Sequence, residues 1–175
     1  MQASTTRIPY DDKKKFYAEV ALELKGIADP LWYTYLANAS ALLKQHLPDV
    51  NWVGFYLAVT KGKAFELVLG PFQGLPACVR IDAGKGVCGS AAVARKTLLV
   101  ADVDAFPGHI ACDSASRSEV VVPLVLEDRL RGDRLLGVLD VDSPLLARFD
   151  EQDRKGLEAL VAVIINGTQW PAEFK

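Results

Sequence analysis

The sequence has no long apolar run and no strong excess of either charge, and it contains only three cysteines. A membrane-spanning helix needs roughly 18 consecutive apolar residues, and no segment here approaches that length, so we expect no membrane protein. The net charge of -2 argues against a nucleic-acid partner, because nucleic-acid binders neutralise phosphates with surplus lysine and arginine. Residues 1–17 contain no apolar signal segment, which predicts a cytoplasmic protein.

The three cysteines, Cys78, Cys88 and Cys112, are too few and odd in number for a static disulfide framework. They are therefore buried fillers, metal ligands or redox-active groups. Together with His109 they could supply four soft ligands to zinc. No CxxC pair is present, however, and the spacings are unlike common zinc motifs. We therefore expect no metal.

Apolar periodicity and turn signals divide the chain into helices and strands without internal repeats or low-complexity segments. Helices are predicted over 11–24, 30–46, 84–96 and from 150 to Gly167, and strands over 51–59, 64–69, 78–81, 98–100, 119–126 and 135–142. Strands that come in hairpins predict an antiparallel sheet with helices on its faces. The fold class is therefore α+β, or a three-layer α/β/α sandwich.

Some local features carry predictions of their own. Asp11 or Asp12, Asp29 and Asp150 are expected to cap helices. Residues 70–76 read as a loop, because they contain two glycines and two prolines. Pro123 indicates an edge strand or a bulge. The polar connection 102–118 is longer than compact domains usually tolerate without a functional reason.

Several separated blocks resemble the free methionine-(R)-sulfoxide reductases, a branch of the GAF-domain superfamily. The blocks are NWVGFYL (51–57), LGPFQGLPACVRI (69–81), GKGVCGSAA (84–92), DVDAFPGHIACDSASRSEVVVP (102–123) and GVLDVDSP (137–144). The resemblance implies a single GAF-type domain over 1–175, with a central six-stranded antiparallel sheet and helices on both faces. Residues 1–10 themselves are expected to form a flexible N-terminal tail. Residues 127–134 depart from the resemblance, because this hairpin tip is longer than the family pattern.

The cysteines acquire roles from their surroundings and from this resemblance. Cys112 lies in the polar connection beside His109 and Asp113, and the residues after it could start a helical turn whose amide groups stabilise a thiolate. The resemblance implies that Cys112 attacks the sulfoxide and that Cys88 resolves the oxidised product. Cys78 is either a core filler or a redox relay from its strand position, and the resemblance favours the redox role. Which of the two resolves first stays open.

The substrate that the resemblance implies carries an ammonium, a carboxylate, a sulfoxide and a methyl group. Asp140 and Asp142 alternate along one strand, so they share a sheet face, and Glu119 begins the preceding strand. Such carboxylates could hold the ammonium, and one of them, kept protonated by its like-charged neighbours, could donate to the sulfoxide oxygen. Trp52 and Tyr56, four apart on one strand, could form an aromatic wall against the methyl group.

Two function classes follow from these patterns. The first is a thiol-dependent reductase of free L-methionine (R)-S-oxide, which needs no cofactor besides an external dithiol such as thioredoxin. The second is a GAF module that does not turn over this substrate: a small-ligand sensor or a thiol redox switch. Family analogy also favours a homodimer.

Overall fold

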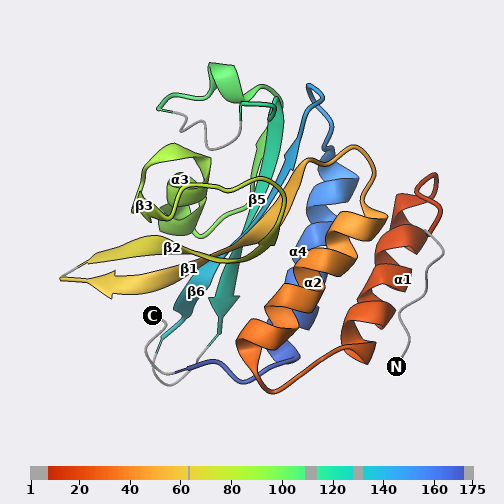
Figure 1. Cartoon of the computed structure of the whole chain (residues 1–175), viewed down its shortest axis with the longest axis horizontal. Coiled ribbons are helices and arrows are strands. Elements are labelled where there is room, and N and C mark those ends of the chain that lie inside the picture. Colours follow the sequence, from red (N-terminus) through yellow and green to blue (C-terminus); the bar gives the residue numbers. More distant parts are fainter. Residues whose placement is uncertain (1–7, 63, 109–113, 128–131, 172–175) are drawn as a thin grey trace.

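The computed structural model describes residues 8–62, 64–108, 114–127 and 132–171. Within them, six strands form one antiparallel sheet in the order β3-β2-β1-β6-β5-β4 (Figure 1). The strands are β1 (Trp52–Lys61), β2 (Ala64–Gln73), β3 (Arg80–Asp82), β4 (Leu98–Val100), β5 (Ser118–Leu126) and β6 (Arg134–Ser143). The helices are α1 (Lys13–Gly26), α2 (Trp32–His46), α3 (Gly86–Ala94) and α4 (Glu151–Asn166), with a short 3-10 turn η1 (Val103–Ala105). The predicted α/β/α sandwich is confirmed.

The two faces of the sheet bury different side chains. Helices α1, α2 and α4 cover one face, and α3 covers the other (Figure 1). Successive residues of a strand point to opposite faces, so Phe55 joins the cluster under the three long helices, whereas Tyr56 joins the cluster under α3. The α3 cluster also contains Trp52 and Cys88. The predicted site residues of β1 therefore lie on the face that α3 covers, which we call the α3 face.

Helix ends follow the sequence signals in two cases and depart from them in a third. Asp12 caps α1 by accepting from Lys15 N at 3.1 Å, and Asp150 forms a capping box with Asp153 at the start of α4. The prediction that Asp29 caps a helix starting at Pro30 is wrong. Asp29 instead accepts from the backbone of Leu31, an extended residue that forms a β-bridge with Gln169 near the C-terminus. This pairing delays α2 until Trp32.

The predicted loop over 70–76 is also wrong in its first half, because β2 continues through Pro71 to Gln73. Proline is tolerated in a strand whose outer side is unpaired, and β3 pairs only with residues 66–68 of β2. The pairing of β2 with β1 shifts register between Gly54 and Tyr56, and this irregularity accommodates the Pro71 segment in the strand. The third strand accordingly starts at Arg80 and not at Cys78.

The prediction for Pro123 is confirmed. β4 pairs with β5 only from Glu119 to Val121, so the outer side of Pro123 is free of a partner strand, and a register shift follows at Leu124. The long connection after β4 contains the turn η1 and returns to β5 at Ser118.

The segment before α1 is described from Ile8 onward, and residues 1–7 lie outside the described part of the chain. Tyr10 packs edge-to-face on Phe16 and donates a hydrogen bond to buried Asp153. Arg148 stacks over the Tyr10 ring at 4.8 Å. In the described residues, no helix has both the length and the apolarity that a membrane crossing requires.

Candidate active site

Strand pairing gathers the predicted acidic and aromatic residues at one end of the α3 face. Asp142 of β6 lies opposite Trp52 of β1 on one side and Glu119 of β5 on the other. Asp140, two residues earlier on β6, shares the same face. Tyr56 lies in the same buried cluster as Trp52. The sheet thus brings together five residues that are scattered over 91 positions of the sequence, from 52 to 142.

Glu119 and Asp140 form a buried acid pair next to Cys88. The two residues are 5% and 6% exposed, and the Cys88 Sγ lies 3.8 Å from Glu119 Oε1. Burial raises the pKa of Asp140 from 3.8 to about 6. Burial, and then the nearby charge of Asp140, raises the pKa of Glu119 well above its usual range. Both shifts favour the protonated carboxyl, and the larger part of this preference falls on Glu119.

The same surroundings keep the Cys88 thiol protonated. Burial, followed by the Asp140 and Glu119 carboxylates, raises the pKa of Cys88 well above the usual thiol range. Cys88 is a free cysteine. Because the thiolate is the reactive form of cysteine, this thiol is a poor nucleophile where it lies.

The acid pair and Cys88 are also the one cluster of potential metal ligands that the described residues contain, with their ligand atoms within 4.8 Å of one another. Two carboxylates and a thiol could hold a divalent cation. The four-ligand zinc set considered from the sequence does not form in this state, because Cys78 is disulfide-bonded. Its members His109 and Cys112 lie outside the described residues.

An aromatic stack borders the acids. The Trp52 ring stacks on Phe72 at 5.3 Å and on Tyr56 at 5.9 Å. Phe72 escaped the sequence analysis, because the FQG segment read as loop. The glycines at 54 and 74 were the sequence signal that could have indicated close packing around Phe72. A Cβ on Gly54 would lie 2.3 Å from Phe72 Cβ, and a Cβ on Gly74 would lie 2.4 Å from Trp52 Cδ1. The stack therefore requires both glycines.

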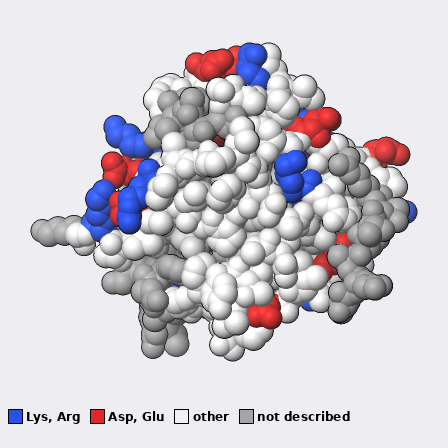
Figure 2. All heavy atoms as spheres, in the orientation of Figure 1, with Lys and Arg blue, Asp and Glu red and all other residues white. Residues whose placement is uncertain are grey.

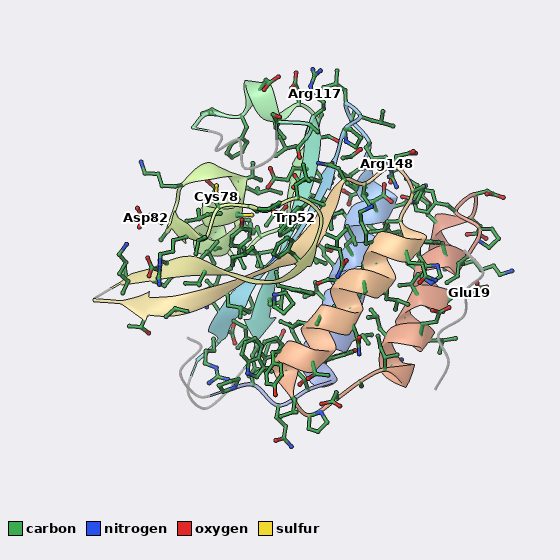
Figure 3. The ribbon with its side chains drawn as sticks, viewed as in Figure 1. Glu19, Trp52, Cys78, Asp82, Arg117 and Arg148 are labelled. Atoms are coloured by element: carbon green, nitrogen blue, oxygen red, sulfur yellow. The ribbon has the colours of Figure 1, made fainter. Side chains whose placement is uncertain are left out.

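The stack also fixes the connection that carries Cys78. Trp52 Nε1 donates to the carbonyl of Leu75 at 3.1 Å, and the Tyr56 hydroxyl donates to the carbonyl of Cys78 at 3.0 Å. Figure 3 shows Cys78 and Trp52 in the same region of the molecule. Cys78 is half-buried and disulfide-bonded, and it packs against the α3-face cluster.

The predicted nucleophile Cys112 and its neighbours His109 and Asp113 lie outside the described residues. The chain on the far side of this segment is anchored at buried Ser116, whose hydroxyl accepts from Asn51 Nδ2 at 3.0 Å. The sequence analysis did not single out Asn51 or Ser116, since a short polar side chain in a loop carries no positional signal. Their contact ties the end of the long connection to the start of β1.

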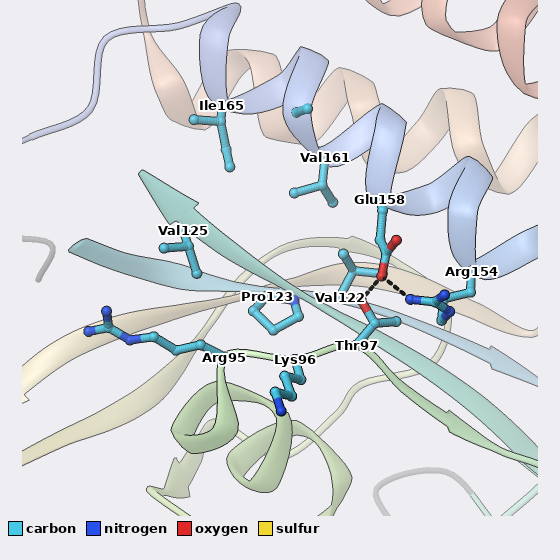
Figure 4. A pocket seen from close by; sticks show the side chains of 11 residues that line it. Arg95, Lys96, Thr97, Val122, Pro123, Val125, Arg154, Glu158, Val161 and Ile165 are labelled. Atoms are coloured by element: carbon cyan, nitrogen blue, oxygen red, sulfur yellow. Dashed lines mark hydrogen bonds and ion pairs between the residues drawn. The ribbon is translucent and has the colours of Figure 1, made fainter. Parts of the chain in front are cut away.

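A separate cavity of about 500 Å³ lies on the other side of the sheet, between β5 and α4 (Figure 4). Glu158 is one of its lining residues and accepts hydrogen bonds from Thr97 and Arg154. Val122, Val125 and Val161 are among its apolar lining residues. It contains none of the predicted site residues, so the candidate site remains the α3 face.

Comparison with known proteins shows the family to which the chain belongs. The GAF domain family model matches residues 34–166. The chain is 45% identical to the free methionine-R-sulfoxide reductase of Escherichia coli over 86% of this chain and 87% of that protein. It is similar to the X-ray structure of free methionine-R-sulfoxide reductase from Neisseria meningitidis in complex with its substrate, with TM-score 0.83 and 43% identity over 95% of each chain. A putative GAF sensor protein from Burkholderia vietnamiensis has TM-score 0.82 and 52% identity over 90% of this chain and 96% of that one.

Proposed function

Because this chain belongs to the free methionine-R-sulfoxide reductases of the GAF-domain family, we propose that it reduces free L-methionine (R)-S-oxide to L-methionine at the expense of a thiol reductant. The buried Glu119–Asp140 pair carries the proposal. The oxygen of a sulfoxide leaves sulfur only when it is protonated, and a buried acid pair whose pKa shifts favour the protonated carboxyl is suited to supply the proton.

Cys112 is the proposed nucleophile. Its thiolate bonds to the sulfoxide sulfur while the oxygen is protonated. The hydroxyl then moves from that sulfur to Cys112 Sγ, the new S–S bond breaks, and methionine leaves with Cys112 oxidised to a sulfenic acid. The thiol of a second cysteine then condenses with the sulfenic acid, which releases water and forms a disulfide. We assign this resolving step to Cys78. In support, Cys78 is disulfide-bonded whereas Cys88 is free, buried and held protonated.

The other site residues have proposed roles in orienting the substrate. One carboxylate oxygen of Asp140, Oδ1, is buried without a hydrogen-bond partner in the described part of the chain. A buried acceptor of this kind is costly unless a ligand satisfies it. We assign it, together with Asp142, to the substrate ammonium, and we assign the proton transfer to Glu119. The Trp52 and Tyr56 rings then face the methyl group.

The test is a chromatographic assay of methionine formed from separate R and S epimers of free methionine sulfoxide, with a small dithiol as reductant. The expected result is turnover of the R epimer alone, its loss in Cys112→Ser, and a fall in kcat of about 10²- to 10⁴-fold in Glu119→Gln. If the protein formed no methionine from either epimer, the proposal would be contradicted. Full activity in Cys112→Ser would contradict the assignment of the nucleophile.

The second candidate is a GAF module that binds a small ligand without turnover. The likeness to a putative GAF sensor protein favours it. The same assay separates the two, because a sensor binds methionine sulfoxide, or another ligand, and releases it unchanged. A thiol redox switch is separated likewise, since peroxide oxidises it while methionine sulfoxide does not.

The remaining parts of the proposal concern the setting of the enzyme. We propose a thioredoxin-type dithiol as the reductant, no further cofactor, and a cytoplasmic location where such dithiols are kept reduced. Residues 1–175 are proposed to form one GAF-type domain. We also propose that two chains form a homodimer, and light scattering coupled to gel filtration would then give twice the mass of one chain.

A further inference from the structure

Two exposed apolar side chains flank the disulfide-bonded Cys78. Leu75 is 63% exposed and Val79 is 64% exposed. The Val79 carbonyl accepts from Leu69 N at 3.0 Å and so continues the pairing of β2 with β3. Val79 directly precedes β3, in which Ile81 is buried in the cluster under α3. Neither side chain contributes to the core or to the proposed substrate contacts.

These observations have a common explanation in the recycling step. We propose that Leu75 and Val79, which we call the Cys78 rim, form the docking surface for the thioredoxin-type reductant, and that the reductant attacks the sulfur of Cys78. The proposal rests on the proposed function, in which Cys78 forms the disulfide. Figure 2 shows Lys, Arg, Asp and Glu mostly toward the outline of this view and uncharged residues over most of its middle.

The Cys78 rim is close enough to Cys78 to fall within the footprint of a protein reductant. Transient redox complexes bury less than about 600 Å² on each partner, which corresponds to a disc of about 14 Å radius. Along the chain, the Cα of Leu75 lies at most about 11 Å from that of Cys78, and the Cα of Val79 about 3.8 Å. A footprint of that radius centred on Cys78 would include both positions. A small dithiol needs neither of them.

The chemistry selects Cys78 as the sulfur that is attacked. A reductant thiolate bonds to Cys78 Sγ, the disulfide breaks, and the other cysteine leaves as a thiolate. The leaving group is then the proposed nucleophile Cys112, whose role in the reaction requires the thiolate form. The second thiolate of the reductant then attacks the mixed disulfide, releases Cys78, which takes up a proton, and leaves the reductant oxidised. One exchange thus restores the attacking thiolate directly.

The first test compares reductants in Leu75→Glu and Val79→Glu. The matched control is Leu22→Glu, at a side chain 66% exposed on α1 across the sheet. We expect the KM for thioredoxin to rise about tenfold in the rim variants, as for a charge placed in an apolar contact, with turnover on dithiothreitol unchanged. If the rim variants had the same KM for thioredoxin as Leu22→Glu, the proposed docking surface would be overturned.

The second test needs no turnover, so it separates failure of this proposal from failure of the proposed function. Oxidised protein is mixed with a thioredoxin whose resolving cysteine is serine, and the trapped mixed disulfide is mapped by peptide mass spectrometry. The expected linkage is to Cys78, with a trapping rate that falls in Val79→Glu and not in Leu22→Glu. A linkage to Cys112 or Cys88 would overturn the direction of attack.

Discussion

Replacement of Asp140 by asparagine is expected to stabilise the fold at alkaline pH while it weakens the enzyme. Asp140 is 6% exposed, and burial raises its pKa from 3.8 to about 6. A carboxyl whose pKa is raised by folding favours the folded state fully only below the unfolded pKa. That advantage is lost as pH rises from about 4 through about 6.

The size of this effect follows from the pKa difference. The step from 3.8 to about 6 corresponds to about 3 kcal/mol of folding free energy between pH 3 and pH 8. Glu119 titrates with Asp140 as one system. Removing the Asp140 charge therefore also relieves the charge repulsion that acts on Glu119. An asparagine buries a neutral amide, which keeps some cost, so about 1–3 kcal/mol of stabilisation at pH 8 is expected.

The measurement is urea unfolding of wild type and Asp140→Asn at pH 5 and pH 8. The expected result is a higher midpoint in the variant at pH 8, an unchanged slope, and a smaller difference at pH 5. Glu19→Gln, an exposed acid on α1, serves as control. If the two proteins differed equally at both pH values, or if the variant were less stable at pH 8, the reasoning from buried charge would be refuted.

Three further predictions concern the core of the site and its supports. Gly54→Ala should lower the free energy of unfolding by about 1–3 kcal/mol in urea titration, since its Cβ would lie 2.3 Å from Phe72 Cβ; a neutral change would show that the stack can shift. In oxidised protein at pH 8, Cys88 should resist iodoacetamide until urea is added, because it is buried and its pKa is raised. Labelling of Cys88 without urea, detected by mass spectrometry, would contradict this prediction. Asp153→Ala should cost about 3–5 kcal/mol in thermal or urea unfolding, because this fully buried carboxylate binds Lys13 and Arg148; a loss below 1 kcal/mol would contradict that role.

The fold could be predicted largely from the sequence where local signals and tertiary pairing agree. The Asp150 capping box fixes α4, and the alternation along β1 separates Phe55 from Tyr56 on opposite faces. The errors occurred where a distant segment decides the local structure. Leu31 stays extended because it bridges to Gln169, and Pro71 lies in a strand because β3 is too short to reach it. Neither partner is visible in a local window.

The site shows the same division. The two-residue period of a strand predicts that Asp140 and Asp142 share a face. It does not predict how deeply each carboxylate is buried. The sequence analysis expected Glu119 to be a neighbour of these acids, but it did not indicate that Glu119 and Asp140 would both be buried. Phe72 was missed for a related reason, because its role depends on two glycines that leave room for the Trp52 ring.

Burial gives the acid pair and the cysteines opposite chemical tasks. The environment that raises the pKa of Glu119 and so keeps a proton available also raises the pKa of Cys88 and suppresses its thiolate. An environment that raises the pKa of a thiol opposes its thiolate, so the proposal places the attacking cysteine outside it. This placement agrees with a nucleophile on the long connection and a resolving cysteine at the exposed edge of the sheet. It also explains why stability and activity are expected to diverge in Asp140→Asn, because the buried charge that destabilises the fold is the group assigned to the substrate ammonium.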